Sequence, residues 1–451
     1  MNKMTHFEIR GVIEGFYGYF YTFPERIKLI EFLSKHRYNH YVYAPKSDRY
    51  HRSRWRDPYP PRTLANFAET IKICQALGIS FCYAISPGQT ICYQSWQDFD
   101  LLKDKLKLFF NMGVRSFSLL LDDIHTNFVH EVDAESHISF AHAHANLCNR
   151  VYGWLCKLHP ACTLSMCPTD YCGSAPFGDY LHELGEKLHP AVNVMYTGPQ
   201  VCSREIKVAH VRDFGEAVSR PPLLWDNYPV NDGEMAAEMH IGPIQGRDGG
   251  LSQFVRGILV NPMNQAEASR IALATYADYF EDPAEYDPQQ SWEKALCEVA
   301  GKESTSSLQL FAQNSLHSCL DENDAALLKS LTEATVLAIQ SGEKPSTCLE
   351  FEQLDSYLDQ LGDASYHLVN EMGNLTLRAE LIPWLELLDE WRCAGKIALD
   401  LLRANEKGTG NTENCKTLIR LKHVIEAYPK RLSSGALMPL IDLSLELCHA
   451  V

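Results

Sequence analysis

The N-terminal part of the sequence alternates short apolar runs with amphipathic segments of helical length. Eight runs rich in β-branched and aromatic residues follow this pattern, over residues 8–15, 40–45, 79–86, 115–123, 163–169, 192–198, 223–227 and 254–262. Parallel strands need a crossover connection, so this alternation predicts repeated βα units. Eight units over roughly 280 residues favour a closed (β/α)8 barrel over an open doubly wound sheet. No glycine-rich phosphate-binding motif follows the first run, which removes the main support for nucleotide binding.

The sequence pattern changes after Phe280. Residues 281–290 are acidic, contain two prolines and have few apolar residues, a composition typical of a domain boundary. Beyond this segment, apolar residues recur at helical spacing and no strand-like alternation returns. We therefore expect a (β/α)8 catalytic barrel over residues 1–282, followed by an all-α helical domain over residues 283–451.

Charge and cysteine content narrow the classes of partner. The 41 basic and 57 acidic residues give a net charge of −16, which repels nucleic-acid phosphates and anionic lipid headgroups. No run approaches the roughly 20 apolar residues that cross a bilayer. The 15 cysteines lack the spacing of a disulfide framework or a zinc site, and no apolar signal segment begins the chain. We therefore expect a cytoplasmic protein with buried thiols, no bound metal, and neither nucleic acid nor membrane as partner.

Polar and aromatic side chains follow most of the predicted strands at the point where each strand ends. They include Gly15 with Tyr17, Lys46, Asp122 with Asp123, Tyr171, Trp225 with Asn227, and Asn261. Because active sites of (β/α)8 barrels lie at this end of the strands, we expect these groups to meet in one site. A lysine, amides, hydroxyls and aromatic rings together are typical of a sugar-binding pocket.

Asp122 and Asp123 are the strongest catalytic candidates. An isolated pair of aspartates is more often a solvated turn or a helix N-cap, but this pair directly follows the apolar run SFSLLL. Two neighbouring carboxylates separate their pKa values, so we expect one ionised and one protonated group near neutral pH. Such a pair combines an electrostatic anchor with a general acid.

Seven ordered motifs sharpen this interpretation. They are GVIEGFYG, YAPK, LLLDDI, CPTDYCG, VMYTGP, LWDNYPVND and GILVNP, and they extend from Gly11 to Pro262. In this order they resemble glycoside hydrolase family 84, the family of O-GlcNAcases and bacterial β-N-acetylglucosaminidases. The resemblance implies a retaining exo-β-N-acetylglucosaminidase that acts on terminal β-linked GlcNAc. Its nucleophile is the substrate's own 2-acetamido oxygen and its intermediate an oxazoline, which is an exception to the two-carboxylate retaining scheme.

The resemblance also implies a role for each site residue. Asp122 would polarise the acetamido N–H, Asp123 would act as general acid and then as base, and Tyr171 would support the acetamido group. The other implied positions would bind the sugar or line its pocket, and they are Gly15, Lys46, Trp225, Asn227, Asp232 and Asn261. No cofactor is implied, and the implied partner is a β-GlcNAc-bearing glycoprotein, glycopeptide or other glycoconjugate.

The sequence departs from the family's motifs in two places. Tyr19, Phe20 and Tyr21 stand where the family usually has a basic residue and a tryptophan, and Asp170 stands where it usually has a glutamate. The change at Tyr19–Tyr21 alters the loop after Gly18. The change at Asp170 is small, because aspartate and glutamate both carry a carboxylate.

Two other functions stay open from the residues alone. A metal-dependent barrel hydrolase using Asp122, Asp123 and nearby His125 would be sensitive to chelators. A catalytically silent sugar-binding scaffold would not turn over an aryl N-acetylglucosaminide. The size and apolar faces of the helical domain further suggest that it forms a homodimer contact or flanks the substrate groove.

Overall fold

The structure is a computed structural model that describes residues 7–136, 138–322, 324–409 and 411–449. It contains two compact units. One comprises the chain up to Gly233 together with Ile244–Ser291, and the other comprises Glu234–Pro243 together with the chain from Trp292 onward. The short segment Glu234–Pro243, which lies in the sequence between two barrel strands, therefore belongs to the second unit.

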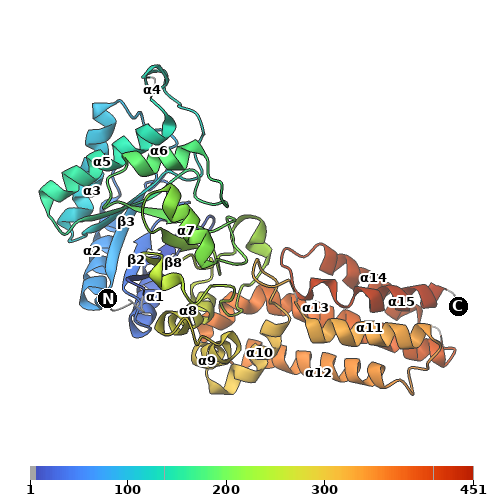
Figure 1. The fold of residues 1–451 in the computed structure, drawn as a ribbon. Helices are drawn as coiled ribbons and strands as arrows, with labels where there is room; N and C mark the ends of the chain where they lie inside the picture. The colour runs from blue at the N-terminus through green and yellow to red at the C-terminus, as the bar shows by residue number, and fades with distance from the viewer. Residues whose placement is uncertain (1–6, 137, 323, 410, 450–451) are drawn as a thin grey trace. The chain divides into compact units, whose positions relative to one another are not determined.

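In the first unit, eight parallel strands close into a barrel in sequence order, which confirms the predicted fold class (Figure 1). The strands are β1 (Ile9–Glu14), β2 (His40–Tyr43), β3 (Ser80–Ile85), β4 (Ser116–Leu120), β5 (Thr163–Cys167), β6 (Asn193–Tyr196), β7 (Leu223–Asp226) and β8 (Gly257–Val260). Val12 of β1 pairs with Tyr41 of β2 and with Val260 of β8, which closes the barrel. Because all strands run the same way, their C-terminal ends share one rim.

The helices of this unit lie around the strands (Figure 1). They are α1 (Phe23–Lys35), α2 (Pro61–Ala76), α3 (Trp96–Asn111), α4 (Glu131–Glu135), α5 (Phe140–Leu158), α6 (Asp179–Lys187), α7 (Val208–Ala217) and α8 (Ala266–Glu281). The start of α1 is set by a capping box, in which the Thr22 side chain accepts from the Glu25 amide and the Glu25 carboxylate accepts from the Thr22 amide at 2.7 Å.

Apolar side chains from every strand fill the interior of the barrel. This buried cluster consists of Ile13, Val42, Ala44, Cys82, Ala84, Leu120, Cys167, Met195, Leu223, Trp225 and Leu259. Two of its members are cysteines, and burial raises the pKa of the Cys167 thiol well above its ordinary value. These thiols therefore pack as small apolar groups in the barrel core.

The second unit is helical in its described residues. Its helices are α10 (Thr305–Gln313), α11 (Ala326–Gln340), α12 (Leu349–Asn370), α13 (Leu375–Glu406), α14 (Thr412–Glu426) and α15 (Met438–His449), and α9 (Pro288–Ala300) leads into it. A disulfide joins Cys415 of α14 to Cys448 of α15. The spacing of the cysteines along the chain gave no indication of this bond. The packing of α14 against α15 brings together two cysteines that are 33 residues apart. This separation is too long to be recognised from the sequence as part of a disulfide framework.

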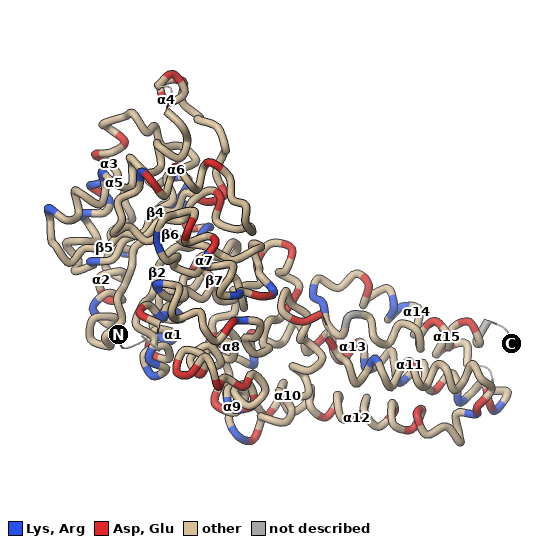
Figure 2. Tube along the Cα trace, viewed as in Figure 1, with Lys and Arg blue, Asp and Glu red and all other residues tan. Residues whose placement is uncertain are grey.

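Charge is spread along the trace of both units instead of forming one block (Figure 2). Within the described ranges, none of the helices combines the length and the apolar character that crossing a bilayer requires.

Candidate active site

Two carboxylates follow β4 at the rim of the barrel. Leu121, the residue after the strand, is buried and its amide donates to the Cys167 carbonyl at 2.9 Å, so sheet pairing continues up to the first acid. Asp122 is buried, and Asp123 has a φ of +48°. Such left-handed backbone is uncommon outside glycine and is concentrated at functional sites, where surrounding contacts hold it in place.

Lys46 places one positive charge beside both acids. Its ammonium forms an ion pair with Asp122 Oδ2 and lies 3.8 Å from Asp123 Oδ2. Burial acts to lower the pKa of Lys46, but the two carboxylates outweigh burial and raise it. The same ammonium lies 5.5 Å from the centre of the Trp225 ring, within the range of a cation–π contact.

Both carboxylate oxygens of Asp123 accept a hydrogen bond from a tyrosine. Tyr17 Oη donates to Oδ2 at 2.8 Å, and Tyr171 Oη donates to Oδ1 at 3.1 Å. Burial acts to raise the pKa of Asp123, but Lys46, the two tyrosines and Arg52 together lower it. In the unliganded site the pKa of Asp123 therefore moves in the opposite direction to the one that a second carboxylate alone would give, because Lys46, the two tyrosines and Arg52 favour the ionised form.

Two asparagines and a glycine form a second part of the site. Asn261 Oδ1 accepts from the Gly15 amide at 3.2 Å, Asn261 Nδ2 donates to Asn227 Oδ1 at 2.9 Å, and Asn227 Nδ2 donates to the Val201 carbonyl at 2.8 Å. Gly15 has a steric role as well, since a Cβ there would lie 2.4 Å from Trp225 Cζ2. Any side chain at this position would therefore clash with the Trp225 indole where it now lies.

Asp232 joins this part of the site to the acids. Its Oδ2 accepts from the Tyr17 amide at 2.6 Å, and the Tyr17 hydroxyl reaches Asp123. Burial raises the pKa of Asp232, against the hydrogen bond from Tyr17. The nine residues predicted from the sequence are thus brought together through a continuous set of contacts at one rim of the barrel.

Two buried polar atoms in this cluster have no hydrogen-bond partner among the described residues. They are Asp122 Oδ1 and Trp225 Nε1. Buried polar atoms are normally satisfied, so an orphaned acceptor and an orphaned donor in one pocket mark positions for ligand groups. Asp122 offers an acceptor for an N–H or O–H group, and Trp225 offers a donor.

Two residues that contact Asp123 have no role predicted from the sequence. Tyr17 is one of several aromatic side chains at the strand ends, and Arg52 belongs to none of the motifs. Arg52 donates to the Tyr17 hydroxyl at 2.6 Å and to the Asp123 carbonyl at 2.8 Å. Tyr17 could have been found from its place in the motif GVIEGFYG, whereas Arg52 lies in an irregular loop after β2 that has no periodic pattern.

Among the described residues of the barrel, two cavities bear on where a substrate could bind. One has a volume of about 460 Å³ and is lined by Asp123, Tyr171 and the β5–α6 loop, including Asp170, Cys172 and Phe177. This cavity adjoins the Asp123 carboxylate, so it offers room for a ligand beside that acid.

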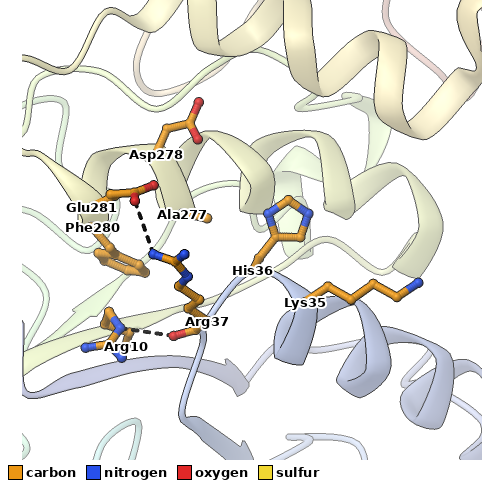
Figure 3. A pocket seen from close by; sticks show the side chains of 8 residues that line it. All are labelled: Arg10, Lys35, His36, Arg37, Ala277, Asp278, Phe280 and Glu281. Atoms are coloured by element: carbon orange, nitrogen blue, oxygen red, sulfur yellow. Dashed lines mark hydrogen bonds and ion pairs between the residues drawn. The ribbon is translucent and has the colours of Figure 1, made fainter.

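The larger cavity, of about 610 Å³, lies at the opposite end of the strands. Arg10, Lys35, His36, Arg37, Ala277, Asp278, Phe280 and Glu281 line it (Figure 3). Three of its charged side chains already have partners there, since Arg37 pairs with Glu281 at 3.1 Å and Arg10 donates to the Arg37 carbonyl at 3.0 Å. Because the N-terminal face of such barrels serves stability, the rim bearing Asp122 and Asp123 is the candidate active site.

A barrel with paired acids, a lysine, amides and aromatic rings at its C-terminal rim defines the class of a glycoside hydrolase. The family model described as beta-N-acetylglucosaminidase matches residues 10–313. The chain therefore belongs to the beta-N-acetylglucosaminidase family, glycoside hydrolase family 84, as the motifs indicated.

Known relatives agree with this assignment. Over 275 residues the chain is 37% identical to the Protein O-GlcNAcase of Rattus norvegicus and to that of Mus musculus, a match covering 60% of this chain and 30% of each relative. The chain thus spans under a third of the length of these curated relatives. A mutant of Thermobaculum terrenum O-GlcNAc hydrolase has a similar structure, with a TM-score of 0.88 and 33% identity, covering 97% of this chain and 94% of that one.

Proposed function

We propose that the chain is a retaining exo-β-N-acetylglucosaminidase that works by substrate-assisted catalysis. The observation that carries this proposal is the orphaned Oδ1 of Asp122, whose other oxygen is fixed by the ion pair with Lys46. A buried, pre-oriented carboxylate oxygen is an ideal acceptor for the N–H of a 2-acetamido group. Accepting that N–H turns the acetamido oxygen toward the anomeric carbon and stabilises the positive charge that the ring gains as it closes.

The proposed reaction has two steps. In the first, the acetamido oxygen attacks the anomeric carbon, the glycosidic C–O bond breaks, and Asp123 donates a proton to the departing oxygen. In the second, the Asp123 carboxylate accepts a proton from water, the water oxygen attacks the anomeric carbon, and the oxazoline ring opens. Two inversions give net retention, and the protein needs no cofactor. Asp123 borders the 460 Å³ cavity, which suits its proposed contact with the leaving group.

The remaining residues have proposed roles in binding. Lys46, Asn227, Asp232 and Asn261 hold sugar hydroxyls, Tyr171 supports the acetamido group and the Gly15 backbone approaches the ring. The Trp225 indole lines the pocket and offers its orphaned Nε1–H to the ligand. Charged and amide groups around an aromatic wall match the alternating hydroxyls and C–H faces of a sugar.

A series of aryl substrates with an increasingly fluorinated N-acyl group tests the nucleophile. Fluorine withdraws electrons from the amide oxygen, so kcat/KM should fall steeply from acetyl to trifluoroacetyl. A thiazoline fused to the sugar ring, which mimics the bicyclic intermediate, should inhibit far below the substrate KM. A flat N-acyl series, or a thiazoline that binds no better than GlcNAc, would show that neighbouring-group participation is wrong.

The two alternative functions lack comparable support. Lys46 already forms ion pairs with both carboxylates, so its positive charge would compete with a divalent cation held there with His125. We expect EDTA to leave turnover unchanged. A silent scaffold has no need of a left-handed Asp123 held by two tyrosines, and turnover of an aryl N-acetylglucosaminide would dispose of it.

We propose a β-GlcNAc-bearing glycoprotein, glycopeptide or other glycoconjugate as substrate, as the names of the relatives suggest. We also propose a cytoplasmic location, which accords with the thirteen cysteines that form no disulfide. Residues 1–282 would carry the chemistry, and residues 283–451 would form the helical domain, together with the segment Glu234–Pro243.

The exposed apolar side chains Leu337, Leu349 and Tyr366 favour a homodimer through that domain. Light scattering would test the homodimer, because a monomeric mass at micromolar protein concentration would contradict it.

A further inference from the structure

Arg52 lies in the loop after β2, is buried, and contacts Asp123 in two independent ways. Nη1 donates to the Tyr17 hydroxyl at 2.6 Å, and that hydroxyl donates to Asp123 Oδ2 at 2.8 Å. Nη2 donates to the main-chain carbonyl of Asp123 at 2.8 Å. One guanidinium therefore reaches both the side chain and the backbone of the same residue.

The contact between Arg52 Nη1 and the Tyr17 hydroxyl orients the O–H bond of Tyr17. Tyr17 Oη accepts from Arg52, so the Tyr17 O–H has to point away from the guanidinium and toward Asp123 Oδ2. The guanidinium carbon also lies 5.4 Å from the centre of the Tyr17 ring, which keeps the ring and the cation together. Without Arg52, the hydroxyl could rotate away from the acid or bond to water.

The second contact supports strained backbone. Asp123 has a φ of +48°, a conformation that a non-glycine residue keeps only when its surroundings hold it. The hydrogen bond from Arg52 Nη2 to its carbonyl is one such restraint. The planar fork of an arginine can serve two acceptors at a fixed spacing, which a lysine ammonium does not reproduce.

From this geometry we propose that Arg52 is a positioning residue for the acid–base group Asp123, acting through the Tyr17 hydroxyl and the Asp123 carbonyl. The proposal rests on the proposed role of Asp123. The Asp123 carboxylate must face the leaving oxygen in the first step and the attacking water in the second. Its orientation therefore affects the rate of both steps. Arg52 has no hydrogen bond to the residues proposed to bind the sugar, among the contacts of the described chain.

Several charged or titratable groups face Asp123, and Arg52 acts alongside them. They are Lys46 after β2, Asp122 at the end of β4, Tyr17 after β1, Tyr171 and Cys172 after β5, and Asp232 after β7. Lys46 is the cation of this set, and Arg52 adds a second positive charge near Asp123. Removing Arg52 leaves Lys46 as the cation opposite the two acids, so the pKa of Asp123 should rise toward its ordinary value while the ion pair with Asp122 persists.

The test compares Arg52→Met with wild type on an alkyl N-acetylglucosaminide and on an aryl one with an activated phenol. Losing two hydrogen bonds that hold a charged group should lower kcat on the alkyl substrate by roughly 10- to 100-fold. Loss on the activated aryl substrate should be several-fold smaller, because its phenol departs without a proton. KM should change little for either substrate.

Arg54→Met is the matched control, because Arg54 lies in the same loop but pairs with Asp57 at the surface. It should match wild type on both substrates. Arg52→Lys keeps the charge without the fork and should show an intermediate loss with the same dependence on the leaving group. This variant decides the question if Arg52→Met does not fold.

Two further readouts separate positioning from mere stabilisation. The basic limb of kcat/KM against pH should move to higher pH in Arg52→Met, which a loss of folded protein would not cause. Tyr17→Phe should share part of the defect, so the double variant should lose less than the product of the two single losses.

The outcomes distinguish this inference from the proposed function. Suppose that the loss of activity in Asp123→Ala depends on the leaving group, but that both Arg52 variants lose kcat equally on the two substrates and keep the wild-type basic limb of kcat/KM. The inference is then overturned and the proposed function stands. If Asp123→Ala itself shows no dependence on the leaving group, the acid assignment fails and the inference falls with it.

Discussion

The ammonium of Lys46 lies 3.8 Å from the carboxylate of Asp123. Its charge, with the hydrogen bonds from the two tyrosines and the nearby Arg52, lowers the pKa of Asp123 in the unliganded site although burial acts to raise it. A bound sugar removes water from this acid and so strengthens the burial effect. The acid should therefore hold its proton more strongly in the complex than in the unliganded protein.

This difference should be visible in the pH dependence of wild-type turnover. The acid has to be protonated, so activity falls as pH rises through its pKa. The basic limb of kcat/KM, which follows the unliganded enzyme, should lie at lower pH than the basic limb of kcat, which follows the complex. Steady-state profiles on one aryl substrate measure both limbs. Coincident limbs would mean that substrate binding leaves the acid unchanged.

Asp123→Ala should separate substrates by the basicity of the leaving oxygen. A proton donor contributes about 10²–10⁴-fold when the departing oxygen is basic and little when it is an activated phenol. The variant should therefore lose most activity on alkyl or protein-linked sugars while keeping much of its glycosylation rate on activated aryl substrates. Pre-steady-state rates across a series of phenols provide the measurement, and equal losses across the series would contradict the assignment.

Asp122→Asn should slow every substrate by a similar factor. The amide keeps the shape of the carboxylate but loses the charge that pairs with Lys46 and that we propose accepts the acetamido N–H. Removing one preorganised group of this kind costs about 10²–10³-fold in kcat. The same phenol series applies, and a loss confined to basic leaving groups would mean that the roles of Asp122 and Asp123 are reversed.

Gly15→Ala should damage the pocket through sterics alone. Its Cβ would lie 2.4 Å from Trp225 Cζ2, so the indole or the end of β1 has to shift. Overpacking of this kind costs about 1–3 kcal/mol in the free energy of unfolding, and KM should rise as the sugar-binding wall moves.

Gly153→Ala is the control, because Gly153 lies in α5 with nothing within 4 Å of an added Cβ. That variant should gain about 0.5–1 kcal/mol from the reduced backbone freedom of alanine and should keep the wild-type KM. Thermal unfolding and steady-state kinetics measure both variants. A Gly15→Ala protein with wild-type KM would show that the indole relaxes without cost.

The eight strands could be predicted from sequence because each is a short apolar run bounded by a loop, and a barrel brings their polar ends together. Lys46, Asp122 and Asn261 were found in this way, since each directly follows a strand or its extension. Arg52 could not be found, because it lies in a loop without periodicity and reaches Asp123 only through the folded structure. The disulfide of Cys415 with Cys448 depends similarly on the packing of α14 against α15.

The assignment of the segment between β7 and β8 to the helical unit could not be predicted from the sequence either. Its residues Glu234–Pro243 belong to the helical unit, where Trp384 Nε1 and the Arg431 amide both donate to the Ala237 carbonyl, at 2.9 and 2.8 Å. Asp232, which contacts Tyr17 in the barrel, precedes this segment by two residues. The helical unit therefore holds the chain directly beyond a proposed sugar-binding residue.

Trp384→Phe tests whether this anchoring matters for binding. Phenylalanine keeps most of the apolar packing but loses the Nε1 hydrogen bond, which should cost about 1 kcal/mol in the free energy of unfolding. If the anchor positions Asp232, KM should rise several-fold while kcat changes little. Trp391→Phe, in the same helix and also buried, is the matched control and should retain the wild-type KM. Denaturant unfolding and steady-state kinetics measure both quantities. A Trp384→Phe protein that is destabilised yet binds substrate normally would limit the segment to a structural role.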